Sequence, residues 1–149
     1  MSTKRRDYRD LIFQIDAELN KIQDADILLE RILLEARLVL NADAGTIYVR
    51  EGDQLVFKYS QNSTIEKRLP PGQKMPYTNL RIPIDDSRIA GYAAKNRVAL
   101  RIADAYAIPS NKPYKWSPSF DQQNNCKTRS NLAQPLITTS GNLLGVKHV

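Results

Sequence analysis

The feature that most constrains the fold is a change of hydrophobic period close to residue 42 of this 149-residue chain. Before that point, apolar residues recur at steps of three and four, which is the spacing of one face of an α-helix. After it, β-branched and aromatic residues roughly alternate with polar ones in short runs, as they do in half-buried strands. Helices followed by strands and short turns predict an α+β fold built on an antiparallel sheet.

Two helices are predicted in the first 41 residues. The second follows a capping aspartate, Asp24 or Asp26, and is the more apolar, so we expect it to pack on the body of the domain. The first carries only a narrow apolar stripe, which suits contact with a partner chain in a homodimer. We therefore separate an N-terminal helix, residues 1–23, from a domain over residues 24–149. The stripe consists of Tyr8, Leu11, Ile12, Ile15, Leu19 and Ile22.

The rest of the chain predicts a central antiparallel sheet of five to six strands, with helices on one face and a long loop over the other. A short helix is expected over residues 87–96, and the long loop over residues 104–125. The last strand-like run reaches the final residue, so we expect the domain to be cut before a closing C-terminal helix. The strand-like runs are residues 46–50, 55–59, 80–84, 99–102, 132–138 and 143–149.

The composition leaves few ways to build an active site. The chain has one histidine, His148, and one cysteine, Cys126, which is too few for the usual three-ligand zinc sets. A Ser-His-Asp triad would have to use that same histidine, and neither a GxxxxGK nor a GxGxxG motif is present. We predict no catalytic residue, no metal site and no enzymatic activity.

Charge and segment patterns also limit the partners and the location. The net charge is +6, but its densest cluster is Lys4, Arg5, Arg6 and Arg9, and the other basic residues are scattered. A nucleic-acid-binding protein would gather such charge on one face, so we do not expect nucleic acid as a partner. The chain lacks a membrane-length apolar run and a signal-peptide pattern, which predicts a soluble, cytoplasmic protein.

Three stretches in order resemble the GAF family, the sensor domain shared by cyclic-nucleotide phosphodiesterases, adenylate cyclases and many bacterial regulators. They are residues 42–49 (ADAGTIYV), 87–92 (SRIAGY) with 100–106 (LRIADAY), and 127–132 (KTRSNL). The resemblance covers roughly residues 25–149 and implies a GAF (PAS-like) fold. It also implies a regulatory domain that senses a small ligand.

Other segments are similar to the GAF domain that precedes HD or HD-GYP phosphohydrolase domains in bacterial signalling proteins. They are residues 59–62 (YSQN), 82–85 (IPID) and 107–109 (AIP). This likeness implies a C-terminal output domain, of HD type, outside the chain. The cyclic-nucleotide signature NKFDE would fall beyond Val149, so cyclic-nucleotide binding stays open.

In GAF relatives the ligand lies between the sheet and the long loop. Carried over by motif, the ligand-binding residues are Thr46, Tyr59, Ser60, Ile89, Ala90, Asp104, Tyr106 and Thr128. Free amides at a helix start favour an anion, so the expected ligand is a cyclic nucleotide or another small anion, and no other cofactor is predicted.

Two structural alternatives and one functional alternative remain open. Ile89 and Ala90 would also pack the helix on the sheet, and Asp104 would also cap the loop or pair with Arg129. If the pocket has collapsed, the domain is a ligand-free dimerisation or scaffold module.

Overall fold

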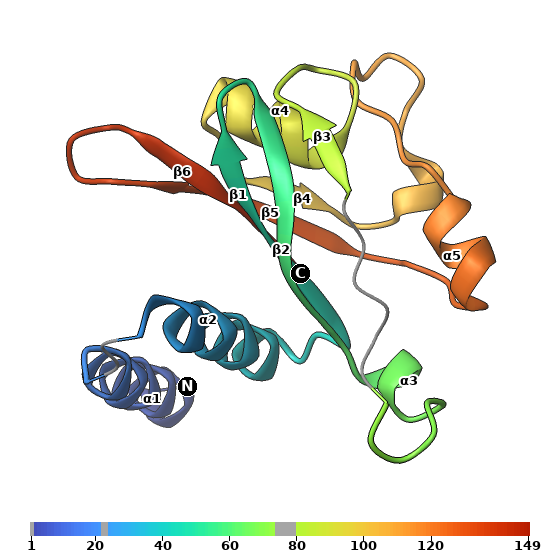
Figure 1. The fold of residues 1–149 in the computed structure, drawn as a ribbon. Coiled ribbons are helices and arrows are strands. Elements are labelled where there is room, and N and C mark those ends of the chain that lie inside the picture. Colours follow the sequence, from blue (N-terminus) through green and yellow to red (C-terminus); the bar gives the residue numbers. More distant parts are fainter. Residues whose placement is uncertain (1, 22–23, 74–79) are drawn as a thin grey trace.

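The computed structural model describes residues 2–21, 24–73 and 80–149 (Figure 1). Six strands form one antiparallel sheet in the order β3-β2-β1-β6-β5-β4, which confirms the predicted α+β class. The strands are β1 (Ala44–Glu51), β2 (Gln54–Asn62), β3 (Arg81–Pro83), β4 (Leu100–Ile102), β5 (Asn131–Ile137) and β6 (Leu143–His148). The helices are α1 (Ser2–Leu19), α2 (Ala25–Leu40), α3 (Ser63–Glu66), α4 (Ile89–Asn96), the 3-10 helix η1 (Ala105–Ala107) and α5 (Ser119–Asn124).

Two hairpins build the centre of the sheet. In the first, Glu51 pairs with Gln54, which leaves a two-residue turn. Gly52 in that turn has a φ of 64°, a conformation that glycine adopts without steric cost. The second hairpin joins β5 to β6, and β6 lies against β1. The two hairpins are therefore neighbours, and their strands β1 and β6 form the middle of the sheet.

Helix α2 covers one face of the sheet. Asp24 caps it, since its Oδ1 atom accepts a hydrogen bond from the amide of Asp26 at 2.9 Å; this decides between the two predicted capping residues. A Cβ atom placed on Gly45 would lie 2.7 Å from Leu33 Cδ1. The glycine in β1 therefore allows α2 to pack closely, on the side of the sheet that buried Ile47 also faces.

Helix α4 lies on the opposite face, together with the long loop (Figure 1). Its buried alanines Ala90, Ala93 and Ala94 pack in one apolar cluster with Tyr48 and Val146 of the two central strands. Small side chains let a short helix sit close to a sheet. The predicted fold has only the long loop on this face, so the position of α4 refines the confirmed fold class.

The predicted loops contain helices that the sequence analysis did not foresee. Helix α3 lies in the segment after β2, and η1 and α5 lie within the long loop. The predicted 87–96 helix begins two residues later, at Ile89. The long loop therefore contains regular secondary structure.

A β-bulge in β2 decides which of its side chains face the loop. Ile47 pairs with Tyr59 and Tyr48 pairs with Phe57, so Lys58 is the extra residue. Strand residues alternate between faces, and the bulge shifts that alternation by one. Phe57 and Ser60 consequently share the loop-facing side, whereas Tyr59 lies with Ile47 on the side of α2.

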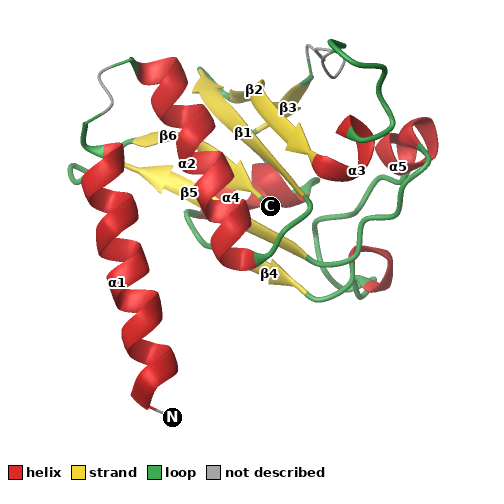
Figure 2. Cartoon of the chain, turned by 90° about the horizontal axis from the view of Figure 1, so that it is seen from below, coloured by secondary structure: helices red, strands yellow, loops and turns green. Residues whose placement is uncertain are grey.

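Helix α1 runs beside α2, and its N-terminal half extends beyond the rest of the domain (Figure 2). Glu18 contacts Arg31 of α2 at 3.5 Å. Much of the predicted stripe is exposed: Tyr8 and Ile12 are each 56% exposed. Ile22 lies outside the described residues. In the described parts of the chain, no helix combines the length and apolar character needed to cross a bilayer.

Candidate ligand site

A row of polar side chains crosses the loop-facing side of the sheet near the start of β1. Ser60 pairs with Thr46, and Thr46 pairs with His148. The hydroxyl oxygens of Thr46 and Ser60 lie 3.4 Å apart, and the Ser60 hydroxyl also donates to the Gly45 carbonyl at 3.3 Å. Two of the predicted site residues, Thr46 and Ser60, are therefore brought together by the register of the sheet.

Two buried nitrogen atoms beside this row have no hydrogen-bond partner within the described residues: Asn131 Nδ2 and His148 Nε2. Asn131 has the same strand parity as Ala133, which pairs with His148, so it faces the same side. An unsatisfied buried polar group costs about 1–3 kcal/mol, and native folds seldom leave one unexplained. We call Thr46, Ser60, Asn131 and His148 the polar row; the sequence analysis missed its last two members.

Burial lowers the pKa of His148 to about 4. The imidazole is therefore neutral at pH 7, with one nitrogen donating and the other accepting. None of the four side chains of the polar row carries a charge at that pH. The row thus offers hydrogen bonds but no countercharge to a ligand.

A buried carboxylate ties the long loop together. Asp121 of α5, which is 2% exposed, accepts hydrogen bonds from the Tyr106 hydroxyl at 2.5 Å and from the Thr128 amide at 2.7 Å. The Thr128 hydroxyl adds a bond of 2.7 Å, and the Cys126 thiol lies 3.6 Å away. Two more predicted site residues, Tyr106 and Thr128, are thus joined through a residue that the sequence analysis did not select.

Hydrogen bonding sets the charge of this carboxylate. Burial by itself raises the pKa of Asp121, but the bonds from Tyr106 and Thr128 outweigh that effect and hold the pKa below its usual value. Asp121 is therefore ionised at neutral pH, and each of its donors forms a charge-assisted bond.

Replacing Asp121 with asparagine is expected to lower the free energy of unfolding by about 2 kcal/mol at pH 7, because an amide nitrogen cannot accept from Tyr106 or Thr128. Urea denaturation measures the loss, with Gln122→Ala at the exposed neighbouring position as the control. The difference should shrink as the pH falls below about 4, where the carboxylate of the unfolded chain takes up a proton while the folded one, whose pKa is lower, stays ionised to a lower pH. Equal stability of the two variants at pH 7 would contradict this role.

The start of α4 is packed and does not join the polar row. Ile89 and Ala90 are each 3% exposed and belong to the apolar cluster. A Cβ atom on Gly91 would lie 2.4 Å from the Pro83 carbonyl oxygen, so β3 passes directly against this turn. The packing alternative therefore describes Ile89 and Ala90.

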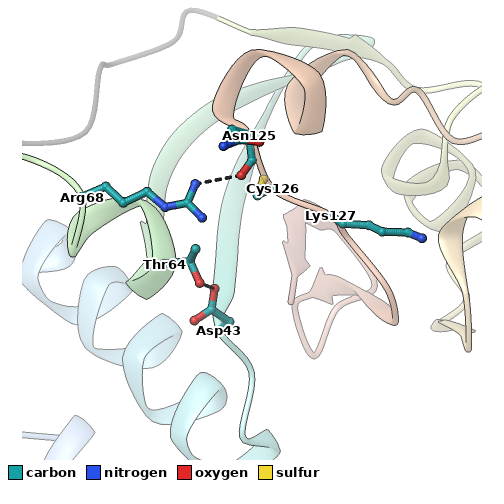
Figure 3. Close-up of a pocket in the computed structure, with 6 residues that line it drawn as sticks. All are labelled: Asp43, Thr64, Arg68, Asn125, Cys126 and Lys127. Carbon is teal, nitrogen blue, oxygen red and sulfur yellow. Dashed lines mark hydrogen bonds between the residues drawn. The ribbon is translucent and has the colours of Figure 1, made fainter.

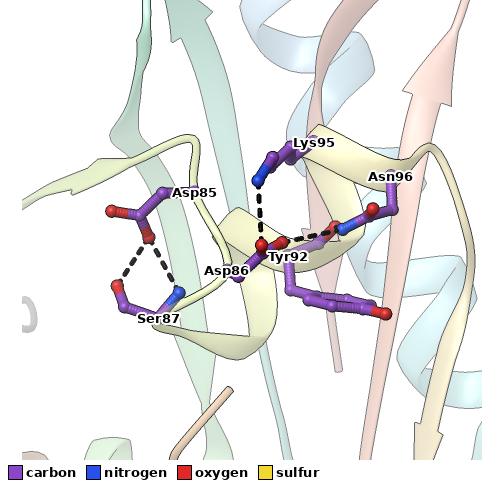
Figure 4. Close-up of polar contacts among 6 residues, drawn as sticks. All are labelled: Asp85, Asp86, Ser87, Tyr92, Lys95 and Asn96. Carbon is purple, nitrogen blue, oxygen red and sulfur yellow. Dashed lines mark hydrogen bonds and ion pairs between the residues drawn. The ribbon is translucent and has the colours of Figure 1, made fainter. Parts of the chain in front are cut away.

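The two acidic residues before α4, Asp85 and Asp86, have hydrogen-bond partners in the same segment (Figure 4). Asp85 accepts from the amide and the hydroxyl of Ser87 at 2.9 and 2.6 Å, and these bonds lower its pKa. Asp86 pairs with Lys95 at 2.8 Å and accepts from Asn96 at 3.1 Å. The bonds from Lys95 and Asn96 lower the pKa of Asp86. Both carboxylates therefore have partners in this segment.

The remaining two predicted residues lie apart from the polar row. Tyr59 is in register with Ile47, so it points to the opposite side of the sheet from Ser60. Asp104 is exposed, and its Oδ1 atom accepts from the Tyr106 amide at 2.9 Å, which caps η1. Capping was one of the two alternatives for Asp104.

A buried arginine holds the end of the sheet that carries the polar row. Arg37 of α2 is 7% exposed and donates to the Asp43 carbonyl at 2.6 Å, the Ser63 hydroxyl at 2.5 Å and the Gln61 side chain at 2.9 Å. One guanidinium thus joins α2 to the start of β1, the end of β2 and α3. Its forked donors suit several acceptors at once.

Two cavities flank this region. The larger, of about 490 Å³, lies between the start of β1, α3 and the segment after α5 (Figure 3). The smaller, of about 260 Å³, lies within the long loop and is lined by Tyr106, Tyr114 and Trp116 among others. Tyr106 is the one predicted site residue in either wall. In the described parts of the chain, no three His, Cys, Asp or Glu side chains gather in a way that could hold a metal ion.

The model of the GAF domain family matches residues 24–146. This chain belongs to the GAF family. The match covers both helices that pack on the sheet and all of its strands except the last two residues of β6, while α1 precedes it.

Solved structures with the same fold come from several proteins. A protein described as a GAF sensor from Burkholderia vietnamiensis is 19% identical, with a TM-score of 0.68 over 95% of this chain and 75% of that one. The GAF domain of a phosphoenolpyruvate-protein phosphotransferase from Coxiella burnetii is 20% identical, with a TM-score of 0.67 over 93% and 74%. Free methionine-R-sulfoxide reductase from Neisseria meningitidis, solved with its substrate, is 19% identical, with a TM-score of 0.66 over 95% and 71%. The GAF fold thus occurs in both sensors and an enzyme, and function rests on the site.

Proposed function

We propose that this GAF domain is the regulatory, ligand-sensing part of a bacterial signal-transduction protein and that its ligand lies on the polar row. The observation that carries the proposal is the pair of buried, unpartnered nitrogens, Asn131 Nδ2 and His148 Nε2. A ligand that accepts from Asn131 and bonds to the neutral imidazole would remove both penalties. Tyr106 and Thr128, held by Asp121, belong to the segment that would close over it.

The same residues favour a ligand whose contacting edge is polar but uncharged. The polar row holds no cation, and Ile89 and Ala90 at the start of α4 are buried in the apolar cluster. A cyclic nucleotide would meet this requirement through the edge of its base. We further propose, on the likeness of residues 59–62, 82–85 and 107–109 to GAF domains before HD-type phosphohydrolases, that the domain controls an output domain of that type.

We also propose that the chain itself is not catalytic. Reduction of a sulfoxide takes two electrons, which a pair of thiols supplies by forming a disulfide; this chain has one cysteine, Cys126. Burial, together with the nearby charge of Asp121, raises the pKa of that thiol. At neutral pH it is mostly protonated, and the protonated thiol is a poor nucleophile.

Native mass spectrometry of the purified chain with cyclic AMP and cyclic GMP tests the proposal. We expect a bound small molecule on the parent, either co-purified or added, and its loss in Asn131→Leu, because the leucine cannot donate to the ligand. The control is Asn111→Leu, at an exposed position in the long loop. If the parent carries no ligand, and Asn131→Leu only raises the stability of the domain, the pocket has collapsed and the proposed site does not bind a ligand.

The alternative function, a ligand-free dimerisation or scaffold module, is favoured by one observation. Helix α1 exposes Ile12 to 56% and Phe13 to 67%, next to Tyr8, and contiguous apolar residues of this kind mark interaction surfaces. The same spectra report the oligomeric state. A dimer without a ligand would support the scaffold function over the sensor.

A further inference from the structure

The larger cavity, of about 490 Å³, carries opposite charges on its walls. Asp43 stands just before β1, and Arg68 follows α3; both line the cavity (Figure 3). They do not pair with each other: none of the ion pairs within 4 Å among the described residues includes either side chain. Two opposite charges therefore face the same space without neutralising each other.

In each of these two charged groups, some atoms have a hydrogen-bond partner and the others have none among the described residues. Arg68 donates through Nη1 to the carbonyl oxygens of Asn125 at 2.7 Å and Asn124 at 3.3 Å, and its Nη2 and Nε atoms have no partner in the described residues. Asp43 accepts from the Thr64 hydroxyl at 2.6 Å through Oδ2, while Oδ1 accepts nothing there. Both groups are thus positioned by the fold and still have hydrogen-bonding capacity.

Lys127, the third charged residue that lines the cavity, does not direct its charge into it. Lys127 points away from the other lining side chains (Figure 3). Its ammonium lies 5.4 Å from the centre of the Tyr106 ring, within the range of a cation–π contact. The charges offered to a ligand are therefore one carboxylate and one guanidinium.

A simple anion in this cavity would face Asp43, and a simple cation would face Arg68, so either would meet a repelling charge. A molecule that carries both an ammonium and a carboxylate satisfies both walls. We propose that this cavity binds a small zwitterion of the free α-amino acid class, with its carboxylate on Arg68 and its ammonium on Asp43. The guanidinium fork matches a carboxylate, and the volume falls in the range of about 300–1,000 Å³ typical of small-molecule pockets.

This second site uses none of the residues of the polar row and stands independently of the proposed sensor function. The full chain is screened by thermal shift against the twenty free L-amino acids, and each one that binds is titrated by calorimetry beside its N-acetyl and its amide derivative. We expect at least one amino acid to bind and both derivatives to lose that binding, since each lacks one of the two charges.

Single substitutions then place the two charges. Arg68→Gln and Asp43→Asn should each weaken binding about tenfold to a hundredfold, the effect of losing a charged hydrogen bond. Arg68→Lys keeps the charge without the fork and should fall between. Lys127→Gln is the matched control and should bind like the parent, as should Asn131→Leu in the polar row. A screen in which no amino acid binds, or binding that survives in a folded Arg68→Gln or Asp43→Asn variant, would overturn the zwitterion site.

Discussion

Lowering the pH from 7 to 4 is expected to cost the domain about 3 kcal/mol of folding free energy through His148 alone. In the unfolded chain this imidazole takes up a proton near pH 6.5, but burial lowers its folded pKa to about 4. Between those values the unfolded state binds more protons, so stability rises with pH. The contribution is complete above about pH 6.5 and is lost as the pH falls towards 4.

His148 is the only histidine in the chain, which makes the measurement direct. Its ring signals in NMR give the folded pKa, and urea denaturation at a series of pH values gives the stability. A His148→Gln variant should show a much flatter profile between pH 4 and 6.5. Asp121 does not confuse this window, because its contribution declines only below about pH 4. An NMR midpoint near 6.5 would show that the imidazole is solvated.

The second large effect is expected from Ala90→Glu, which should lower the free energy of unfolding by about 4 kcal/mol or prevent folding. Ala90 is 3% exposed and lies in the apolar cluster on the inner side of α4. The added carboxylate would find no cation among the side chains of that cluster. Burying an unpaired charge costs several kcal/mol even after relaxation.

The matched control for this substitution is Ala99→Glu, which adds the same side chain at an exposed position just after α4. Thermal melting compares the two variants with the parent, and the control should melt close to the parent. If Ala90→Glu also melted close to the parent and lost a ligand instead, position 90 would border an open pocket. That result would contradict the burial of Ala90 in the apolar cluster.

Most of the architecture could be predicted because the spacing of the apolar residues and the turn residues indicate it. The capping of α2 by Asp24 or Asp26 is a local signal, and the structure decides for Asp24. Helices α3 and α5 were missed because they are short and polar: STIE and SFDQQN contain no apolar repeat. Such helices exist only through contacts that are distant in sequence, such as those of Asp121.

The candidate site was less predictable, since its members are defined by tertiary contacts. Thr46 and Ser60 were found through family motifs, and the sheet register brings them together. Asn131 and His148 give no local signal, because an unpartnered nitrogen is visible only once the surroundings are known. Tyr106 and Thr128 were predicted as ligand-binding residues from family motifs, but their link through Asp121 depends on tertiary contacts that the sequence pattern does not reveal.

The unpaired residue Lys58 reverses the relation between odd and even residue numbers and the two faces of β2. Before it, the odd-numbered residues Leu55 and Phe57 face the loop; after it, the even-numbered Ser60 does. If Lys58 were instead paired regularly with Ile47, without a bulge, Tyr59 would pair with Thr46. The strand would then present the Tyr59 phenol to the polar row in place of the Ser60 hydroxyl. The chemistry that this strand offers to a ligand is therefore set by the bulge as much as by the identity of its residues, and loss of the bulge would alter the site while every side chain stayed the same.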